Sequence, residues 1–276
     1  MRICSGDVRE RHMTNNIITR RTKGGISMSE WNPWHGCTKI SPGCQNCYVY
    51  RRDEEFGRNP SIVQKTTTFD LPVRRRKNGT HVLSPSGGTV YTCFTSDFFH
   101  PDADEWRKEA WGFMRDRRDL KFFMVTKRPD RFHVSLPFDW DDGYDNVYIC
   151  CTCEDQARAD ERLPVFLGLP IKHPSIICEP MLENINIEPY LEKYGDKIEQ
   201  VTCGGESGAH ARIFSYSWAL SLHEQCRRYD VSFRFKQTGS AFEKDGRLYL
   251  IKRREQITQA VKAGINYQGK SQELLR

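Results

Sequence analysis

The sequence predicts an α/β fold in which a buried parallel sheet alternates with helices. Six short apolar runs, rich in β-branched and aromatic residues, follow one another at roughly the spacing of one strand–helix unit. The runs are apolar throughout, which is typical of strands covered on both faces, and each ends in polar or charged residues. The architecture is therefore a βα barrel or an open doubly wound sheet. The predicted strands lie in residues 89–97, 121–130, 146–155, 174–181, 199–208 and 231–239.

Helices are predicted between these runs and at the end of the chain. Residues 102–118 and 215–229 both repeat apolar positions at helical spacing, behind acidic or serine residues suited to a helix start. Further on, Asp245-Gly246 is a hairpin turn signal within residues 241–251. An amphipathic helix is expected from about Arg254.

The chain of 276 residues suits one large domain. Residues 1–27 hold six Arg or Lys against two acids, and we interpret them as a flexible basic leader. Residues 28–276 are predicted to form a single domain. Within it, residues 56–89 show no sustained period and indicate an insertion loop. Residues 241–276 form a C-terminal extension.

Composition restricts the setting in which the protein works. No apolar run is long enough to span a membrane, and the first residues lack the apolar centre of a secretory signal. Eleven cysteines are too sparse and irregular for a secreted disulfide scaffold. They indicate a reducing cytoplasm in which thiols stay free to bind metal. We therefore expect a cytoplasmic protein with no membrane partner.

The positive charge is concentrated in two regions. The formal net charge is +6, but residues 51–77 hold eight basic and four acidic residues, and residues 227–254 hold nine and three. Such clusters are typical of proteins that bind a polyphosphate such as nucleic acid. The alternative for each cluster is a solvated charged face.

Three cysteines, Cys37, Cys44 and Cys47, form the pattern C-x6-C-x2-C. Pro and Gly interrupt this stretch so often that we expect a loop, which can aim three thiolates at one point. Thiolates select zinc, copper(I) or iron–sulfur clusters, and three of them leave one position open. One interpretation is a structural zinc site with His35 or another cysteine as fourth ligand. The other is a four-iron cluster whose open iron binds S-adenosylmethionine, as in enzymes that cleave this cofactor reductively.

Polar residues follow each predicted strand, at the edge where parallel βα folds place their sites. Glu179 ends an otherwise apolar strand, so we expect it to be paired, with a ribose diol or an ammonium as possible ligand. A salt bridge to Lys127 or Arg128 is the structural alternative. The strand-end residues are Ser96, Asp97, Lys127, Arg128, Glu154, Asp155, Glu179, Glu206, Ser207, Lys236 and Gln237.

Other features near the strand ends are less specific. The glycine-rich turn at residues 204–208 can bring backbone N–H groups close to a carboxylate or a phosphate, or can simply be a tight turn. Asp97 and Asp155 are expected to be surface charges. The cysteines in residues 150–153 could hold a second metal, but we favour inert core residues.

Several segments occur together over residues 29–240: WNPWHGCTKISPGCQNCY, FTSDFFH, VTKRPDRF, SIICEPM, CGGESG with Arg212, and FKQTG. This set resembles the phage-encoded three-cysteine-motif family, a group similar to the radical S-adenosylmethionine enzymes. The resemblance implies a (βα)6 partial barrel like part of a TIM barrel. It also implies a [4Fe-4S] cluster at the N-terminal end of the barrel, in the loop after a short first strand, bound by Cys37, Cys44 and Cys47.

Two motifs depart from the commonest radical enzymes, whose cysteines have C-x3-C-x2-C spacing with an aromatic residue before the last one. Here Asn46 precedes Cys47, so Tyr48 becomes the candidate to pack on the adenine. The GGE motif of those enzymes comes early and receives the methionine amino group, whereas GGESG comes late in this chain. We carry it over as a cofactor contact.

The resulting hypothesis is a radical S-adenosylmethionine enzyme that abstracts hydrogen through a 5′-deoxyadenosyl radical. The expected substrate is a nucleobase of phage DNA, rearranged or modified as in thymine hypermodification, with flavodoxin or ferredoxin as electron donor in the host cytoplasm. The alternatives are a zinc-stapled, non-catalytic nucleic-acid-binding protein and a radical enzyme acting on a free nucleotide. Residues expected to bind the cofactor are Tyr48, Ser96, Glu154, Glu179, Gly204, Gly205, Glu206, Ser207 and Arg212. Lys127, Arg128, Lys236 and Gln237 are expected to face the substrate as catalytic residues.

Overall fold

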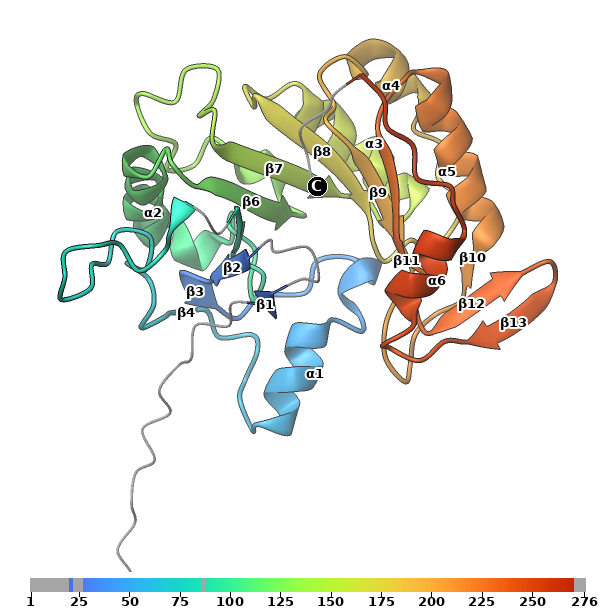
Figure 1. Ribbon diagram of the computed structural model, residues 1–276, viewed down its shortest axis with the longest axis horizontal. Helices are drawn as coiled ribbons and strands as arrows, with labels where there is room; N and C mark the ends of the chain where they lie inside the picture. Colours follow the sequence, from blue (N-terminus) through green and yellow to red (C-terminus); the bar gives the residue numbers. More distant parts are fainter. Residues whose placement is uncertain (1–19, 22–26, 86–87, 271–276) are drawn as a thin grey trace, which may run out of the picture.

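The computed structural model describes residues 20–21, 27–85 and 88–270. Its centre is a curled sheet of seven parallel strands that forms a half-barrel (Figure 1). All six predicted strands are present, and one further strand precedes them. In spatial order they are β2 (Ser27–Trp31), β5 (Thr89–Thr92), β6 (Lys121–Thr126), β7 (Val147–Thr152), β8 (His173–Cys178), β9 (Val201–Gly204) and β11 (Phe233–Gln237).

Helices follow most of these strands and cover the convex face of the sheet (Figure 1). The two helices expected from apolar spacing are confirmed, each within two residues of its expected ends. The α-helices are α1 (Tyr48–Glu55), α2 (Asp104–Asp116), α3 (Gln156–Leu167), α4 (Glu188–Tyr194), α5 (Tyr216–Arg228) and α6 (Gln256–Lys262). Short 3-10 helices are η1 (Pro42–Cys44), η3 (Pro101–Ala103) and η4 (Pro129–Arg131).

The two faces of the sheet carry different side chains, because successive residues of a strand point to opposite sides. On the convex face, Phe122, Ile149 and Ile176 join one large core with the helices. On the concave face, Phe123, Tyr148 and Cys150 form a separate small cluster. The cysteines of residues 150–153 are buried in these two clusters, so the prediction that they are core residues is confirmed.

Both edges of the sheet are covered. At one edge, β1 (Arg20–Arg21), which lies within the predicted leader, pairs antiparallel with β2; residues 1–19 and 22–26 of the leader fall outside the described residues. At the other edge, Tyr267 pairs antiparallel with Phe233 of β11. Pairing at the edges removes open backbone groups that would otherwise attract another strand.

The insertion loop and the C-terminal extension are attached to this sheet. The loop contains β4 (Gln64–Lys65), which pairs with β3 (Trp34–His35), and it buries Phe69, Leu71 and Leu83 in the main core. The predicted hairpin is present as β12 (Ala241–Lys244) and β13 (Arg247–Leu250), with β10 (Phe214–Ser215) beside β12. Asp245 and Gly246 both have positive φ, as a two-residue hairpin turn requires. Among the described residues, none of the helices is both long and apolar enough to cross a membrane.

The core of the convex face provides a first prediction. Phe122 is fully buried and contacts the ring of Trp31 at 5.6 Å, whereas Phe138 is 95% exposed. Phe122→Ala should lower the free energy of unfolding by about 3–5 kcal/mol, because it removes apolar contacts and leaves a cavity. Phe138→Ala should change it by less than about 0.5 kcal/mol. Urea denaturation followed by circular dichroism measures both, and equal losses in the two variants would contradict the described core.

Candidate functional site

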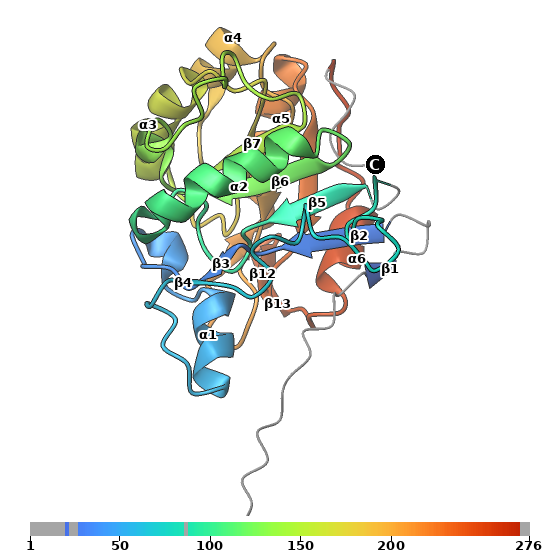
Figure 2. The same cartoon turned by 90° about the vertical axis from the view of Figure 1, so that its left-hand side faces the viewer.

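The three-cysteine segment, residues 36–47, is named here the cysteine loop. It follows β3 and lies against the carboxyl ends of the parallel strands; Figure 2 shows β2 and β5 side by side, with α1 beyond the ends to which their arrows point. Gly36 begins the loop with φ +96°, and a Cβ there would lie 2.2 Å from the carbonyl oxygen of Ile62. Ser96, after β5, donates its hydroxyl to the Gly36 carbonyl. The loop therefore starts at a fixed point on the edge of the sheet.

A buried ion pair holds the first part of the loop. Arg128 Nη1 lies 3.1 Å from Asp97 Oδ2, and the two residues are 6% and 5% exposed. Arg128 Nη2 donates to both the carbonyl and the hydroxyl oxygen of Thr38 at 2.9 Å, and Nη1 lies 3.7 Å from Cys37 Sγ. Asp97 also accepts a hydrogen bond from the Thr126 hydroxyl at 2.8 Å. The prediction of Asp97 as a surface charge is wrong, because this carboxylate is the buried counterion of Arg128.

A second pair holds the middle of the loop. Glu154, fully buried after β7, accepts a hydrogen bond from the Gly43 backbone N–H at 3.1 Å and pairs with Arg162 Nη1 at 2.9 Å. Burial acts to raise the pKa of Glu154, but Arg162 and the Ser41 hydroxyl outweigh it and hold that pKa below its usual range. A Cβ on Gly43 would lie 2.9 Å from the Glu154 carboxyl carbon, so only glycine allows this approach.

A third pair holds the end of the loop. Glu206, after β9, accepts hydrogen bonds from Arg212 Nη2 at 2.7 Å and from Asn46 Nδ2 at 2.9 Å. Arg212 Nη1 also donates to the Pro42 carbonyl at 3.0 Å. Burial acts to raise the pKa of Glu206, yet the hydrogen bonds from Arg212 and Asn46 lower it overall.

These contacts change the roles expected for five residues. Ser96, Arg128, Glu154, Glu206 and Arg212 were expected to touch cofactor or substrate, but their polar atoms are engaged with the cysteine loop or with the buried partners that hold it. They are positioning residues in this structure. Sequence reasoning missed their partners Thr38, which the quoted motif contains but to which no role was given, and Arg162, which belongs to no motif. It noted Asn46 only for its place before Cys47.

The three cysteines of the loop differ from the other cysteines that the structure describes. Cys37, Cys44 and Cys47 are partly exposed, whereas the seven others are buried. Burial of its thiol raises the pKa of Cys37 to about 11, with Arg128 acting in the opposite direction. Over the described part of the chain, no group of three or more His, Cys, Asp or Glu side chains is arranged to hold a metal ion. The donor set fits a soft metal centre, and convergence of the three thiolates remains a prediction for the metal-bound protein.

His35, the fourth ligand in the zinc interpretation, has a different partner. Its Nε2 lies 2.7 Å from Oδ2 of Asp53, a buried residue of α1. This pair joins β3 to α1 on either side of the cysteine loop. The structure therefore offers no observation in favour of a three-cysteine, one-histidine zinc site.

Glu179 lies on the rim formed by β8, β9 and β11. It pairs with Lys236 Nζ at 2.6 Å and accepts a hydrogen bond from Gln237 Nε2. The carboxylate is therefore paired, as expected, and the structural alternative of a salt bridge to Lys127 or Arg128 is wrong. Arg128 is already engaged with Asp97 and Thr38, and Lys236 and Gln237 reach Glu179 from the end of β11.

In the GGESG turn, the two glycines allow close packing and the serine belongs to a polar network. A Cβ on Gly205 would lie 2.4 Å from the Thr238 carbonyl oxygen, so this glycine allows close contact with the segment after β11. Gly204 is the residue paired with Gln237 in the sheet. Ser207 donates to Gln256 Oε1 at 2.9 Å and receives a hydrogen bond from Arg253.

Tyr48 and Lys127 remain available on this rim. The Tyr48 ring is half exposed, and its hydroxyl donates to the Phe94 carbonyl. Burial of that hydroxyl raises the pKa of Tyr48, and the nearby Cys47 thiol acts in the same direction. Lys127 is half-buried, and its ammonium is near enough to Glu154 to help lower the pKa of that carboxyl group, after the larger effects of Arg162 and Ser41.

The first predicted basic region proves to be partly structural. Arg74 pairs with Asp70, Arg75 donates to the Gly79 carbonyl, and Arg76 donates to the carbonyls of residues 81 and 82. These guanidinium groups hold the insertion loop together. They are therefore weak support for a nucleic-acid surface.

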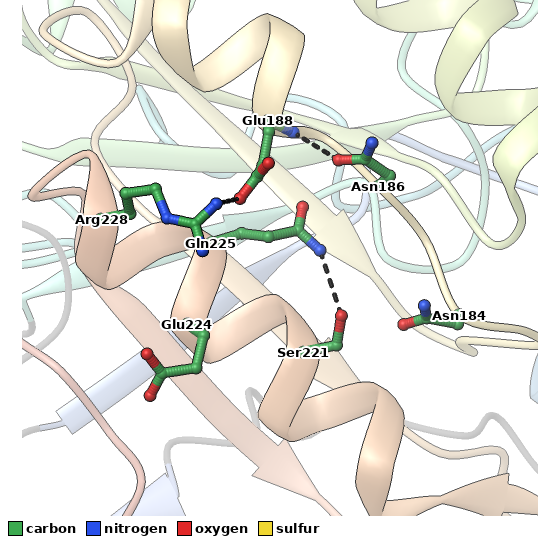
Figure 3. Close-up of a pocket in the computed structure, with 7 residues that line it drawn as sticks. All are labelled: Asn184, Asn186, Glu188, Ser221, Glu224, Gln225 and Arg228. Carbon is green, nitrogen blue, oxygen red and sulfur yellow. Dashed lines mark hydrogen bonds and ion pairs between the residues drawn. The ribbon is translucent and has the colours of Figure 1, made fainter.

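A polar pocket of about 310 Å³ lies elsewhere, between the segment before α4 and the helix α5 (Figure 3). Arg228 pairs with Glu188 across it, and the buried Gln225 donates to Ser221. None of its lining residues belongs to the cysteine loop or to the residues that hold it. The pocket is thus separate from the candidate site.

Comparison with known proteins identifies the family but no activity. A family model described as "Protein of unknown function (DUF5131)" matches residues 23–274. The chain belongs to this family. The match of the DUF5131 model covers the cysteine loop, all seven parallel strands and the hairpin extension. Searches among curated proteins and among solved structures found no match.

The contacts of Glu154 generate a second prediction. Glu154→Gln keeps the shape of the side chain but leaves buried Arg162 without its counterion, so it should destabilise the protein by about 3–5 kcal/mol. Glu161→Gln, at an exposed position of α3, removes the same charge and should change the free energy of unfolding by less than about 0.5 kcal/mol. Chemical denaturation at neutral pH measures both. Equal stability of the two variants would show that Glu154 does not hold the loop.

The lowered pKa values of Glu154 and Glu206 give a third prediction. Each pKa lies below the value of 4.5 expected for the unfolded chain. Between the folded-state pKa and pH 4.5, the unfolded state therefore binds more protons than the folded state does. The stabilisation is therefore complete above pH 4.5 and is lost as the pH falls through the lower, folded-state values. Unfolding measured from neutral to acidic pH should show a smaller acid loss for Glu154→Gln than for the wild type, and parallel curves would contradict this.

Proposed function

We propose that this protein is a radical S-adenosylmethionine enzyme whose [4Fe-4S] cluster is held by Cys37, Cys44 and Cys47. The observation that carries the proposal is the contrast among the cysteines: these three are partly exposed on one loop, and the other seven described are buried. When bound, such a cluster supplies the electron that cleaves S-adenosylmethionine to methionine and a 5′-deoxyadenosyl radical.

The position of the loop supports this proposal. Three ion pairs fix it at the carboxyl edge of a parallel half-barrel, which is the edge where βα folds carry their active sites. With three protein ligands, a four-iron cluster has one iron left for the amino and carboxyl groups of the cofactor. Tyr48, adjacent to Cys47, presents a half-exposed ring against which an adenine can pack.

The remaining rim residues would orient the reactants. Glu179 and Ser207 provide oxygen atoms on the β8–β9 side, where a ribose or an ammonium group can be bound. Lys127, after β6, and Lys236 and Gln237, at the end of β11, would face the substrate. The radical would take a hydrogen atom from an unactivated carbon, forming 5′-deoxyadenosine and a substrate radical. The proposed substrate is a nucleobase of DNA, and an acidic electron carrier such as flavodoxin would supply the electron.

Metal analysis tests the proposal. Anaerobically purified protein should be brown and hold about four irons per chain, and after chemical reduction it should convert S-adenosylmethionine to 5′-deoxyadenosine. Cys44→Ala should lose most of the iron and all of this product. Cys226→Ala is the matched control, because Cys226 is buried in the core, and it should keep both.

Two results would contradict the proposal. Colourless protein with one zinc per chain would favour the metal-stapled binding protein instead. Equal iron content in the Cys44 and Cys226 variants would show that the cysteine loop is not the ligand set.

A further inference from the structure

A group of aromatic rings on the concave face of the sheet belongs to no part of the main core. Tyr91 contacts Phe94 at 5.3 Å and Phe123 at 5.6 Å, and Phe94 stacks on Phe123 at 6.3 Å between centroids. Tyr148 joins the same cluster from the next strand. Tyr91 and Phe94 are only half-buried, so the cluster keeps exposed ring surface.

This aromatic cluster lies beside the cysteine loop. Phe94 follows β5, and its carbonyl accepts the hydrogen bond from the Tyr48 hydroxyl. Tyr48 in turn follows Cys47 directly. A planar ligand on these rings would therefore be next to the proposed site of the cofactor.

An unneutralised arginine faces the cluster from the far side of the half-barrel. Arg234 of β11 is half-buried, and in the described parts of the chain its guanidinium has no hydrogen bond and no ion pair. Arg234 is paired through Thr202 with Ile177, which packs against the aromatic cluster, so the strand register places its side chain on the same concave face. Burial raises the pKa of Tyr91, and Arg234 followed by Lys236 acts in the opposite direction. A half-buried cation without a counterion is costly unless a ligand supplies the negative charge.

Other arginines of the same basic region already have partners. Arg228 pairs with Glu188 and Arg227 with Glu224, while Arg253 donates to Ser207. Arg234 is therefore distinguished from them by both its burial and its missing partner. The combination of aromatic rings with a free cation fits a ligand that is flat at one end and anionic at the other.

We propose that the concave face binds one nucleotide of a DNA strand, with its base against Tyr91, Phe94 and Phe123 and its phosphate at Arg234. Aromatic side chains stack on bases of any sequence, and a neighbouring cation binds the backbone. The inference rests on the proposed function for the reaction that follows, and it adds the residues that hold the substrate.

A strand fits this face better than a free nucleotide does, because further cations lie beyond the aromatic cluster. Arg52 is exposed and lies one helical turn after Tyr48 in α1. Lys252 is exposed next to Arg253, whose guanidinium contacts Gln237 at the end of β11. We expect these exposed cations to bind phosphates on either side of the bound nucleotide.

Fluorescence anisotropy with a labelled, thymine-containing single-stranded oligonucleotide tests the proposal on the full chain. Arg234→Gln should weaken binding about tenfold and reduce the dependence of log affinity on log salt by about one charge. Arg227→Gln, the same change on the outer helix α5, should bind like the wild type. Because Arg234 has no protein partner in the described fold, its variant should unfold at the wild-type temperature.

A second variant tests the aromatic cluster. Tyr91→Leu keeps apolar volume but removes the ring, and it should weaken binding at least about fivefold. Equal binding by Arg234→Gln, Arg227→Gln and wild type would overturn the proposal. It would also be overturned if thymidine monophosphate displaced the labelled oligonucleotide at the same concentration as the unlabelled oligonucleotide does.

The two proposals can fail separately, because DNA binding is measured without reduction or S-adenosylmethionine. Wild-type protein that forms 5′-deoxyadenosine but does not bind the oligonucleotide would overturn only this inference. Protein that binds the oligonucleotide through Arg234 but holds no iron would overturn only the proposed function.

Discussion

Three buried carboxylates, each paired with an arginine, fix the cysteine loop to the carboxyl edge of the sheet, and the site depends on them. The carboxylates are Asp97, Glu154 and Glu206, which follow three different strands. Each ionised group is costly to bury by itself, so the loop and the strand ends are stable only when both partners are present. A loop rich in Pro and Gly has few backbone partners of its own, and these side chains replace them.

This arrangement divides the rim into a scaffold and an open part. On the side of β5, β6 and β7, most polar groups hold the loop. Around Glu179 and Lys236, and on the concave face at Tyr91 and Arg234, polar and aromatic groups remain accessible. The groups on the concave face are accessible because side chains alternate along each strand: one set packs against the helices and the other points to the concave face. The proposed chemistry and substrate binding use only the open part.

The fold could be predicted from the sequence because its signals are local. Apolar runs at strand–helix spacing identified six of the seven parallel strands, and Asp245-Gly246 identified the hairpin. The strand before the cysteine loop has no apolar run, and only the family resemblance indicated it. The positions of the rim residues were also predicted correctly as strand ends.

The roles of those residues could not be predicted, because they depend on partners distant in the chain. Glu206 is a cofactor ligand or a loop anchor according to whether Asn46, 160 positions away, reaches it. In the same way, the sequence shows that Arg234 belongs to a basic region, but only the fold shows that it has no counterion among the described residues. Spacing alone contains neither piece of information.

In the proposed enzyme, the anchored cysteine loop would hold a four-iron cluster in which one iron has no cysteine ligand. Electron paramagnetic resonance of the reduced protein, with and without S-adenosylmethionine, measures whether that iron binds the cofactor. We expect a reduced [4Fe-4S] signal that changes when the cofactor is added, because the cofactor would bind the iron that lacks a cysteine. A signal unaffected by the cofactor, or none in protein that contains zinc, would contradict it.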